Sequence, residues 1–100
     1  MRVFDWLRDL LRRPGQAPLS AIRQTGRDSY TVALDSRTFW INAEMLQGDP
    51  DVVIYQSTVR DITTGMPFHE APLADPRGRR RAVRELARYF RSSGARYSIG

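Results

Sequence analysis

Hydrophobic residues in the last third of the chain recur with the period of an α-helix. Asp75 followed by Pro76 is a typical helix start, and Gly94 is a typical helix end. Within this segment the apolar positions fall at i, i+3, i+4 and i+7, which predicts one face packed on a core. These apolar positions are Val83, Leu86, Ala87 and Phe90.

Apolar and polar residues alternate earlier in the chain, which is the period of a β-strand. Residues 29–34 place Tyr30, Val32 and Leu34 on one face, and residues 37–43 place Phe39 and Ile41 on one face. Residues 19–25 predict a weaker strand before them. Residues 52–62 predict the strongest strand, because Val, Ile, Tyr and Thr dominate. Short polar turns join these segments, so we expect an antiparallel meander. The opening run of residues 52–55 is apolar on both faces, which predicts a central position in the sheet.

Three further elements complete the predicted order. Residues 3–13 have the spacing of a short amphipathic helix, and residues 95–99 predict a last short strand. Asn42 is predicted to cap a single helical turn that runs through Leu46 and ends at Gly48.

The pattern and the length together predict one α+β domain over residues 1–100. Residues 1–15 would hold the N-terminal helix and its stop, and residues 19–99 the sheet–helix–strand core. We expect an antiparallel sheet of four to five strands, with the long helix packed on one face. A chain of this size buries roughly 65% of its unfolded surface, enough for a core of its own.

Charge adds a second property to the long helix. The net charge is +5, and all sixteen basic residues are Arg. At about 100° per residue, six arginines fall within roughly 100° of arc beside the apolar stripe. They are Arg77, Arg80, Arg81, Arg84, Arg88 and Arg91.

This cationic face has two interpretations. It is either a solvated helix face or a binding surface for phosphate, carboxylate or an acidic protein. Glu85 is the only acid between Arg77 and Gly100, so acids elsewhere in the fold or a partner would have to offset the repulsion. The sequence supports the two interpretations about equally, and our leading hypothesis of a protein-binding domain adopts the second.

Nucleic acid is the alternative partner, because charge alone attracts phosphates. The chain has no helix-turn-helix pattern, no zinc-finger spacing and no aromatic pattern of an RNA-recognition sheet. Phe39, Trp40 and Tyr55 could stack on bases, but such residues more often belong to the sheet and core.

Catalytic and metal chemistry find little support. There is no cysteine, and His69 is the only histidine. A small hydrolase would pair His69 with Glu70 or a hydroxyl such as Ser57, but His69 lies in a proline-flanked segment, where an exposed or hydrogen-bonded loop residue is expected. No motif predicts a metal or cofactor site. We expect a non-enzymatic protein without a cofactor.

Two residues of the sheet region are further candidates for binding. Glu44 follows a predicted strand, and could be a carboxylate paired with an arginine, a partner contact or a surface acid. Trp40 points opposite to Phe39 and Ile41, so either its strand is covered on both sides or Trp40 is an exposed contact.

The sequence also predicts where the protein works. It has no uninterrupted apolar run of a secretory signal and no apolar stretch long enough for a transmembrane helix. A cytoplasmic location is expected. An open sheet edge beside the final strand could also pair with a second copy of the chain.

Residues 22–99 resemble a bacterial immunity-protein family, the one numbered seventy-four in polymorphic toxin systems. The resemblance rests on short motifs in order: Tyr30-Thr-Val, Trp40-Ile-Asn-Ala-Glu44-Met-Leu-Gln-Gly48, Val53-Ile-Tyr55, a proline-containing loop, the amphipathic helix, and Gly94-Ala-Arg-Tyr97-Ser-Ile99. It implies a non-enzymatic protein that binds and neutralises a cognate toxin, with Glu44 as a fold or contact residue. The N-terminal segment lies outside the match. Because the chain is basic, either such a toxin carries an acidic patch or the arginine face is not the interface.

Overall fold

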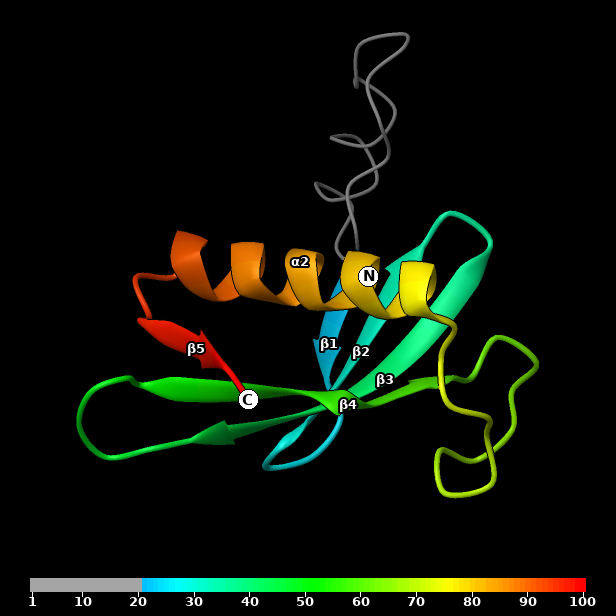
Figure 1. Cartoon of the computed structure of the whole chain (residues 1–100), viewed down its shortest axis with the longest axis horizontal. Helices are drawn as coiled ribbons and strands as arrows, with labels where there is room; N and C mark the ends of the chain where they lie inside the picture. Colours follow the sequence, from blue (N-terminus) through cyan, green and yellow to red (C-terminus); the bar gives the residue numbers. More distant parts are fainter. Residues whose placement is uncertain (1–20) are drawn as a thin grey trace, which may run out of the picture.

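The computed structural model describes residues 21–100, so the helix predicted over residues 3–13 lies outside the described residues. These residues form an α+β fold in which one helix crosses one face of a five-stranded sheet (Figure 1). The elements in chain order are β1 (Ala21–Gln24), β2 (Ser29–Leu34), β3 (Arg37–Met45), β4 (Val52–Asp61), α2 (Pro76–Ser92) and β5 (Tyr97–Ile99).

The strands lie side by side in chain order, from β1 at one edge to β5 at the other. The first four form the predicted antiparallel meander, and β4 is an interior strand, as its apolar opening run predicts. The expectation of a wholly antiparallel sheet is wrong, because β5 pairs with β4 in parallel. The intervening α2 carries the chain back across the sheet, so that β5 starts beside the beginning of β4.

The helical turn predicted to start at Asn42 is also wrong, because β3 continues through Met45. Glu44 pairs with Val53 and Met45 with Val52 across the β3–β4 ladder. The backbone hydrogen bonds of this ladder outweigh the local capping preference of asparagine, as tertiary pairing commonly does. Gly48, at φ 117°, lies in the connection between the two strands rather than at a helix end.

The core lies between the sheet and α2, and its largest fully buried side chains come mainly from the sheet. Leu86, Ala87 and Phe90 are buried as the apolar stripe predicts, whereas Val83 is only half-buried. Ala82, which is outside the predicted stripe, is fully buried. The core members of the sheet are Tyr30, Val32, Leu34, Phe39, Ile41, Ala43, Val52, Ile54 and Val59.

Gly78 lets the start of α2 approach the sheet closely. A Cβ atom at this position would lie 2.8 Å from Cζ of Phe39 and 2.8 Å from Oδ1 of Asp75. Phe39 is fully buried and cannot move away without disturbing its neighbours. Glycine is therefore required for the distance between helix and sheet.

A bulge interrupts β4 in the middle of the sheet. Trp40 pairs with Arg60 but Asn42 pairs with Tyr55, so a single β3 residue opposes residues 56–59 of β4. Thr58 closes the bulge, because its Oγ1 accepts from the Asn42 backbone N–H at 3.0 Å and donates to the Tyr55 carbonyl at 2.6 Å. The bulge redirects β4 and returns its later residues to the core.

The loop between β4 and α2 folds back onto the outer sheet face. The rings of Phe68 and Trp40 stack with centroids 4.2 Å apart and planes at 9°. Trp40 is therefore half-buried. This burial is intermediate between the two predicted outcomes, a strand covered on both sides and an exposed Trp40. Within residues 21–100, no helix has the length and apolar character needed to cross a membrane.

Candidate functional site

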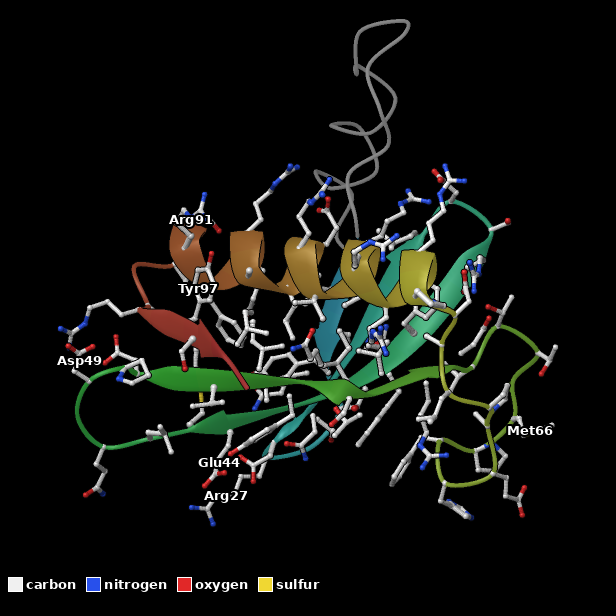
Figure 2. All side chains as sticks on the ribbon, in the orientation of Figure 1. Arg27, Glu44, Asp49, Met66, Arg91 and Tyr97 are labelled. Carbon is white, nitrogen blue, oxygen red and sulfur yellow. The ribbon has the colours of Figure 1, made fainter. Side chains whose placement is uncertain are left out.

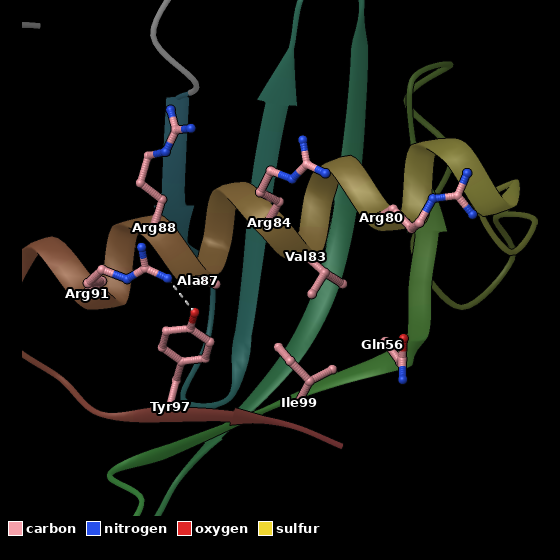
Figure 3. Close-up of a pocket in the computed structure, with 9 residues that line it drawn as sticks. All are labelled: Gln56, Arg80, Val83, Arg84, Ala87, Arg88, Arg91, Tyr97 and Ile99. Carbon is pink, nitrogen blue, oxygen red and sulfur yellow. Dashed lines mark hydrogen bonds between the residues drawn. The ribbon is translucent and has the colours of Figure 1, made fainter.

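A groove runs between α2 and the edge strand β5, with a volume of about 540 Å³. The helix forms one wall, and β5 with the bulged part of β4 forms the other (Figure 3). Its lining combines cationic, apolar and aromatic side chains. They are Gln56, Arg80, Val83, Arg84, Ala87, Arg88, Arg91, Tyr97 and Ile99.

The helical wall follows from the sequence around the helix start. The Oδ2 atom of Asp75 accepts from the Gly78 backbone N–H at 3.4 Å, and Pro76 occupies the first turn, where its missing N–H costs nothing. Because the helix has 3.6 residues per turn, residues three or four positions apart lie on the same side. Four arginines with this spacing line the groove: Arg80, Arg84, Arg88 and Arg91.

The six predicted arginines are all exposed, and the structure divides them between the groove and the rest of the helix surface. Arg77 does not line the groove. Arg81 reaches the β2–β3 turn instead, where its Nη2 lies 3.1 Å from Oδ2 of Asp35. The predicted cationic face is therefore real, but only part of it forms a concave site.

Among residues 21–100, few acids neutralise these arginines. Glu85 lies 3.7 Å from Arg88, one turn away on the same helix, and Asp35 pairs with Arg81. Within residues 21–100, no carboxylate oxygen lies within 4.0 Å of the nitrogens of the remaining four. These four are Arg77, Arg80, Arg84 and Arg91.

The other nearby acids are held by arginines outside the groove. Arg37 contacts Asp61 at 3.0 Å and also binds Asp75. The bond from Arg37 lowers the pKa of Asp75, and the Thr63 hydroxyl, followed by Arg37, lowers the pKa of Asp61. Both carboxylates therefore stay ionised at neutral pH and are already paired. Arg96 similarly contacts Asp49 and Asp51.

The strand wall of the groove includes residues that the sequence did not single out for binding. Tyr97 accepts a hydrogen bond from Arg91 at 2.8 Å, and the Arg91 guanidinium lies 5.8 Å from the centroid of its ring (Figure 3). Ile99 is 43% exposed and lies on the same side of β5, two residues further on. The sequence shows that Tyr97 and Ile99 alternate with Ser98 and share one side of the strand. It does not show that this side faces the arginines of α2, because that depends on the parallel pairing of β5 with β4.

Glu44 lies on the outer face of the sheet (Figure 2). Trp40 alternates with the buried residues of β3 and lies on the same face, and neither residue joins the arginines in the groove. The Glu44 carboxylate accepts from the Tyr55 hydroxyl at 2.8 Å, and this bond raises the pKa of Tyr55. Its hydrogen-bond partner is thus a tyrosine rather than an arginine. Trp40 is occupied by its stack on Phe68. The predicted site residues therefore belong to two opposite faces.

His69 is exposed in the loop between β4 and α2, where its ring meets the edge of the Phe68 ring with centroids 5.6 Å apart. It does not line the groove. In the part of the chain that the structure describes, no three His, Cys, Asp or Glu residues gather as a metal site would require.

Comparison with protein-family models, with curated proteins and with solved structures finds no match to this chain. The interpretation of the groove therefore depends on its own residues and geometry.

Proposed function

We propose that this chain is a non-enzymatic protein-binding domain that uses the arginine-lined groove to bind an acidic surface of a protein partner. One observation carries the proposal. Arg80 and Arg84 have no carboxylate within ion-pair distance among residues 21–100, and they lie beside exposed apolar surface in the same groove. Arginine next to aromatic and aliphatic side chains is the composition of energetically important protein interfaces.

The mixed lining favours a protein over nucleic acid. Val83, Ala87 and Ile99 supply an apolar strip that phosphates would leave unused. The Tyr97 ring is engaged with Arg91 rather than presented as a stacking platform. Nucleic acid remains the alternative partner, because the exposed arginines of α2 would attract phosphates as well as carboxylates.

The resemblance of residues 22–99 to an immunity-protein family suggests the identity of the partner. We propose a bacterial toxin made by the same cell, which the domain would meet and neutralise in the cytoplasm. The cationic groove then requires an acidic patch on the toxin. Glu44, which the resemblance marks as a fold or contact residue, suits the first role through its bond to Tyr55.

The test is affinity capture from the native lysate with the whole chain and with an Arg84→Glu/Arg88→Glu variant. The matched control is Arg23→Glu/Arg27→Glu, which makes the same change of charge at exposed positions at the β1 edge. Half of each lysate is treated with nuclease. We expect one protein that survives nuclease, is lost with the α2 variant and is kept by the control.

The result also has a functional readout. The captured protein would be expressed with and without this chain, and growth would be measured. Toxicity that the chain relieves, and that the Arg84→Glu/Arg88→Glu variant does not, supports the immunity proposal. Recovery of nucleic acid alone, abolished by nuclease, overturns it and supports the alternative.

A further inference from the structure

Strand β5 is an edge strand with one open side. Its inner side is fully used, because Val52 and Gln56 of β4 donate to the carbonyls of Arg96 and Gly100, and Gly100 donates to the carbonyl of Ile54. Alternation along a strand then turns the N–H and C=O groups of Tyr97 and Ile99 outward. In the described part of the chain, no strand pairs with this outer side.

The open edge lies directly beside the arginine-lined groove. The side chains of Tyr97 and Ile99 point toward α2 and line the groove (Figure 3). Their backbone N–H and C=O groups lie in the plane of the sheet, as in any strand. A further strand would lie about 4.8 Å beyond β5. Every second side chain of that strand would then point to the same side as Tyr97, where the guanidinium groups of α2 lie.

We propose that β5 is the docking edge for an extended acidic segment of the partner, which adds to the sheet as a further strand beneath the arginines of α2. This inference rests on the proposed function and specifies how the groove reads its partner. The backbone of Tyr97 and Ile99 sets the register, and the arginines select Asp or Glu at alternate positions. The apolar strip of the groove covers the stems of those acidic side chains.

Charge argues against a second copy of the chain as the occupant. Two β5 edges paired about a two-fold axis perpendicular to the sheet would bring two α2 helices onto the same face. Arg80, Arg84, Arg88 and Arg91 of one copy would then face the same arginines of the other. Such repulsion protects the edge from self-pairing and leaves it open to an acidic strand.

The probe is a blocked peptide in which glutamate alternates with threonine, labelled for fluorescence anisotropy. Two matched peptides carry N-methyl groups, one on all glutamate amides and the other on all threonine amides. Successive amides of a strand point to opposite sides, so only one of the two peptides loses the hydrogen bonds to β5. We expect that peptide to bind about tenfold more weakly and the other to bind like the unmethylated one.

Equal affinities for the two methylated peptides would overturn strand addition, since charge alone does not distinguish them.

An Arg84→Ala/Arg88→Ala variant distinguishes failure of strand addition from failure of the proposed function. If it weakens binding of every peptide while methylation has no effect, the cationic groove stands and the strand geometry is wrong. If the unmethylated peptide does not bind, or binds the variant as tightly as the parent chain, the cationic groove and the strand geometry are both wrong. Dimers of the chain alone in sedimentation would instead assign the edge to a second copy.

Discussion

Arg91 and Tyr97 join the last turn of the helix to the edge strand through a hydrogen bond of 2.8 Å. The two residues are only six positions apart, but the chain reverses direction between them. Gly94, at φ 84°, provides the left-handed conformation that ends the helix. This contact fixes the width of the groove at one end, because the guanidinium and the ring belong to its opposite walls.

Replacing Tyr97 by phenylalanine should release Arg91 without emptying the groove wall. The hydrogen bond is lost while the ring stays, and both groups are partly solvated, so we expect a loss of about 0.5 kcal/mol in the free energy of unfolding. Urea denaturation measures this loss. A Ser98→Ala variant, altered on the other side of β5, is the control. A loss as large as that of a core residue would show that the hydroxyl does more than position Arg91.

Replacing Gly78 by alanine should destabilise the fold although alanine is the better helix former. The gain in helix propensity is about 1 kcal/mol, and the clash of the new Cβ with Phe39 costs about 1–3 kcal/mol. We expect a net loss of about 1 kcal/mol by thermal or urea unfolding. In a Phe39→Leu background, where the ring is gone and the contact with the Asp75 carboxylate remains, the same change should cost less. A loss of the same size in both backgrounds would refute the close-packing argument.

The pairing of Arg37 with Asp61 and Asp75 should make stability depend on pH in the acid range. Both carboxyls have a folded pKa below their ordinary value of 3.8, so the unfolded chain binds more protons as pH falls. Their contribution is complete above the unfolded pKa and is lost as pH drops through the folded pKa. Urea unfolding at pH 7 and at successively lower pH below 4 measures it.

In Arg37→Gln the difference from the parent chain should be largest at neutral pH and shrink in acid. Arg27→Gln, which removes an exposed charge on the opposite side of the sheet from the helix, is the control (Figure 2). A difference that is independent of pH would mean that Arg37 acts through its contact with the Phe39 ring, 4.7 Å away, rather than through the two carboxylates.

Replacing Glu44 by glutamine should change the outer face of the sheet and leave the groove unaffected. Without the carboxylate, the pKa of Tyr55 should fall toward its ordinary value of 10.0, because the hydrogen bond that its hydroxyl donates to Glu44 is the main cause of the increase. Spectrophotometric titration of tyrosinate detects this change. Because Glu44 lies outside the groove, capture of the partner should be unchanged; a loss comparable to that of Arg84→Glu/Arg88→Glu would place part of the interface on the outer face.

The local patterns of this sequence predict most of its elements. The period of two marks β2 to its exact ends, and Asp75, Pro76 and Gly94 mark both ends of α2. These signals work because they depend on side chains within a few residues of each other. Asn42 misleads for the opposite reason, since its segment is decided by partners on β4 that local preference cannot reveal.

Only the helical wall of the candidate site could be predicted from the sequence. The arginine face follows from helical geometry, and all six arginines are exposed as expected. Which of them form a groove depends on where β5 returns, and a three-residue strand carries no signal of parallel pairing. Gln56 enters the groove only because β4 bulges beside it. Tertiary placement, rather than composition, therefore determines the shape of the site.

The parallel pairing of β5 also has a consequence for the order in which the fold is assembled. Each strand from β1 to β4 meets its neighbour along the chain through a short connection, so the meander can form by successive local hairpins. Val52 meets Tyr97 only after the loop and α2 have formed, and only three residue pairs then hold β5 in place. We expect the edge that we assign to the partner to be the last strand to dock and the first to open, with backbone amides that exchange with solvent faster than those of β2 and β3. Binding of the partner at β5 would therefore stabilise the least stable strand of the sheet and slow its local opening.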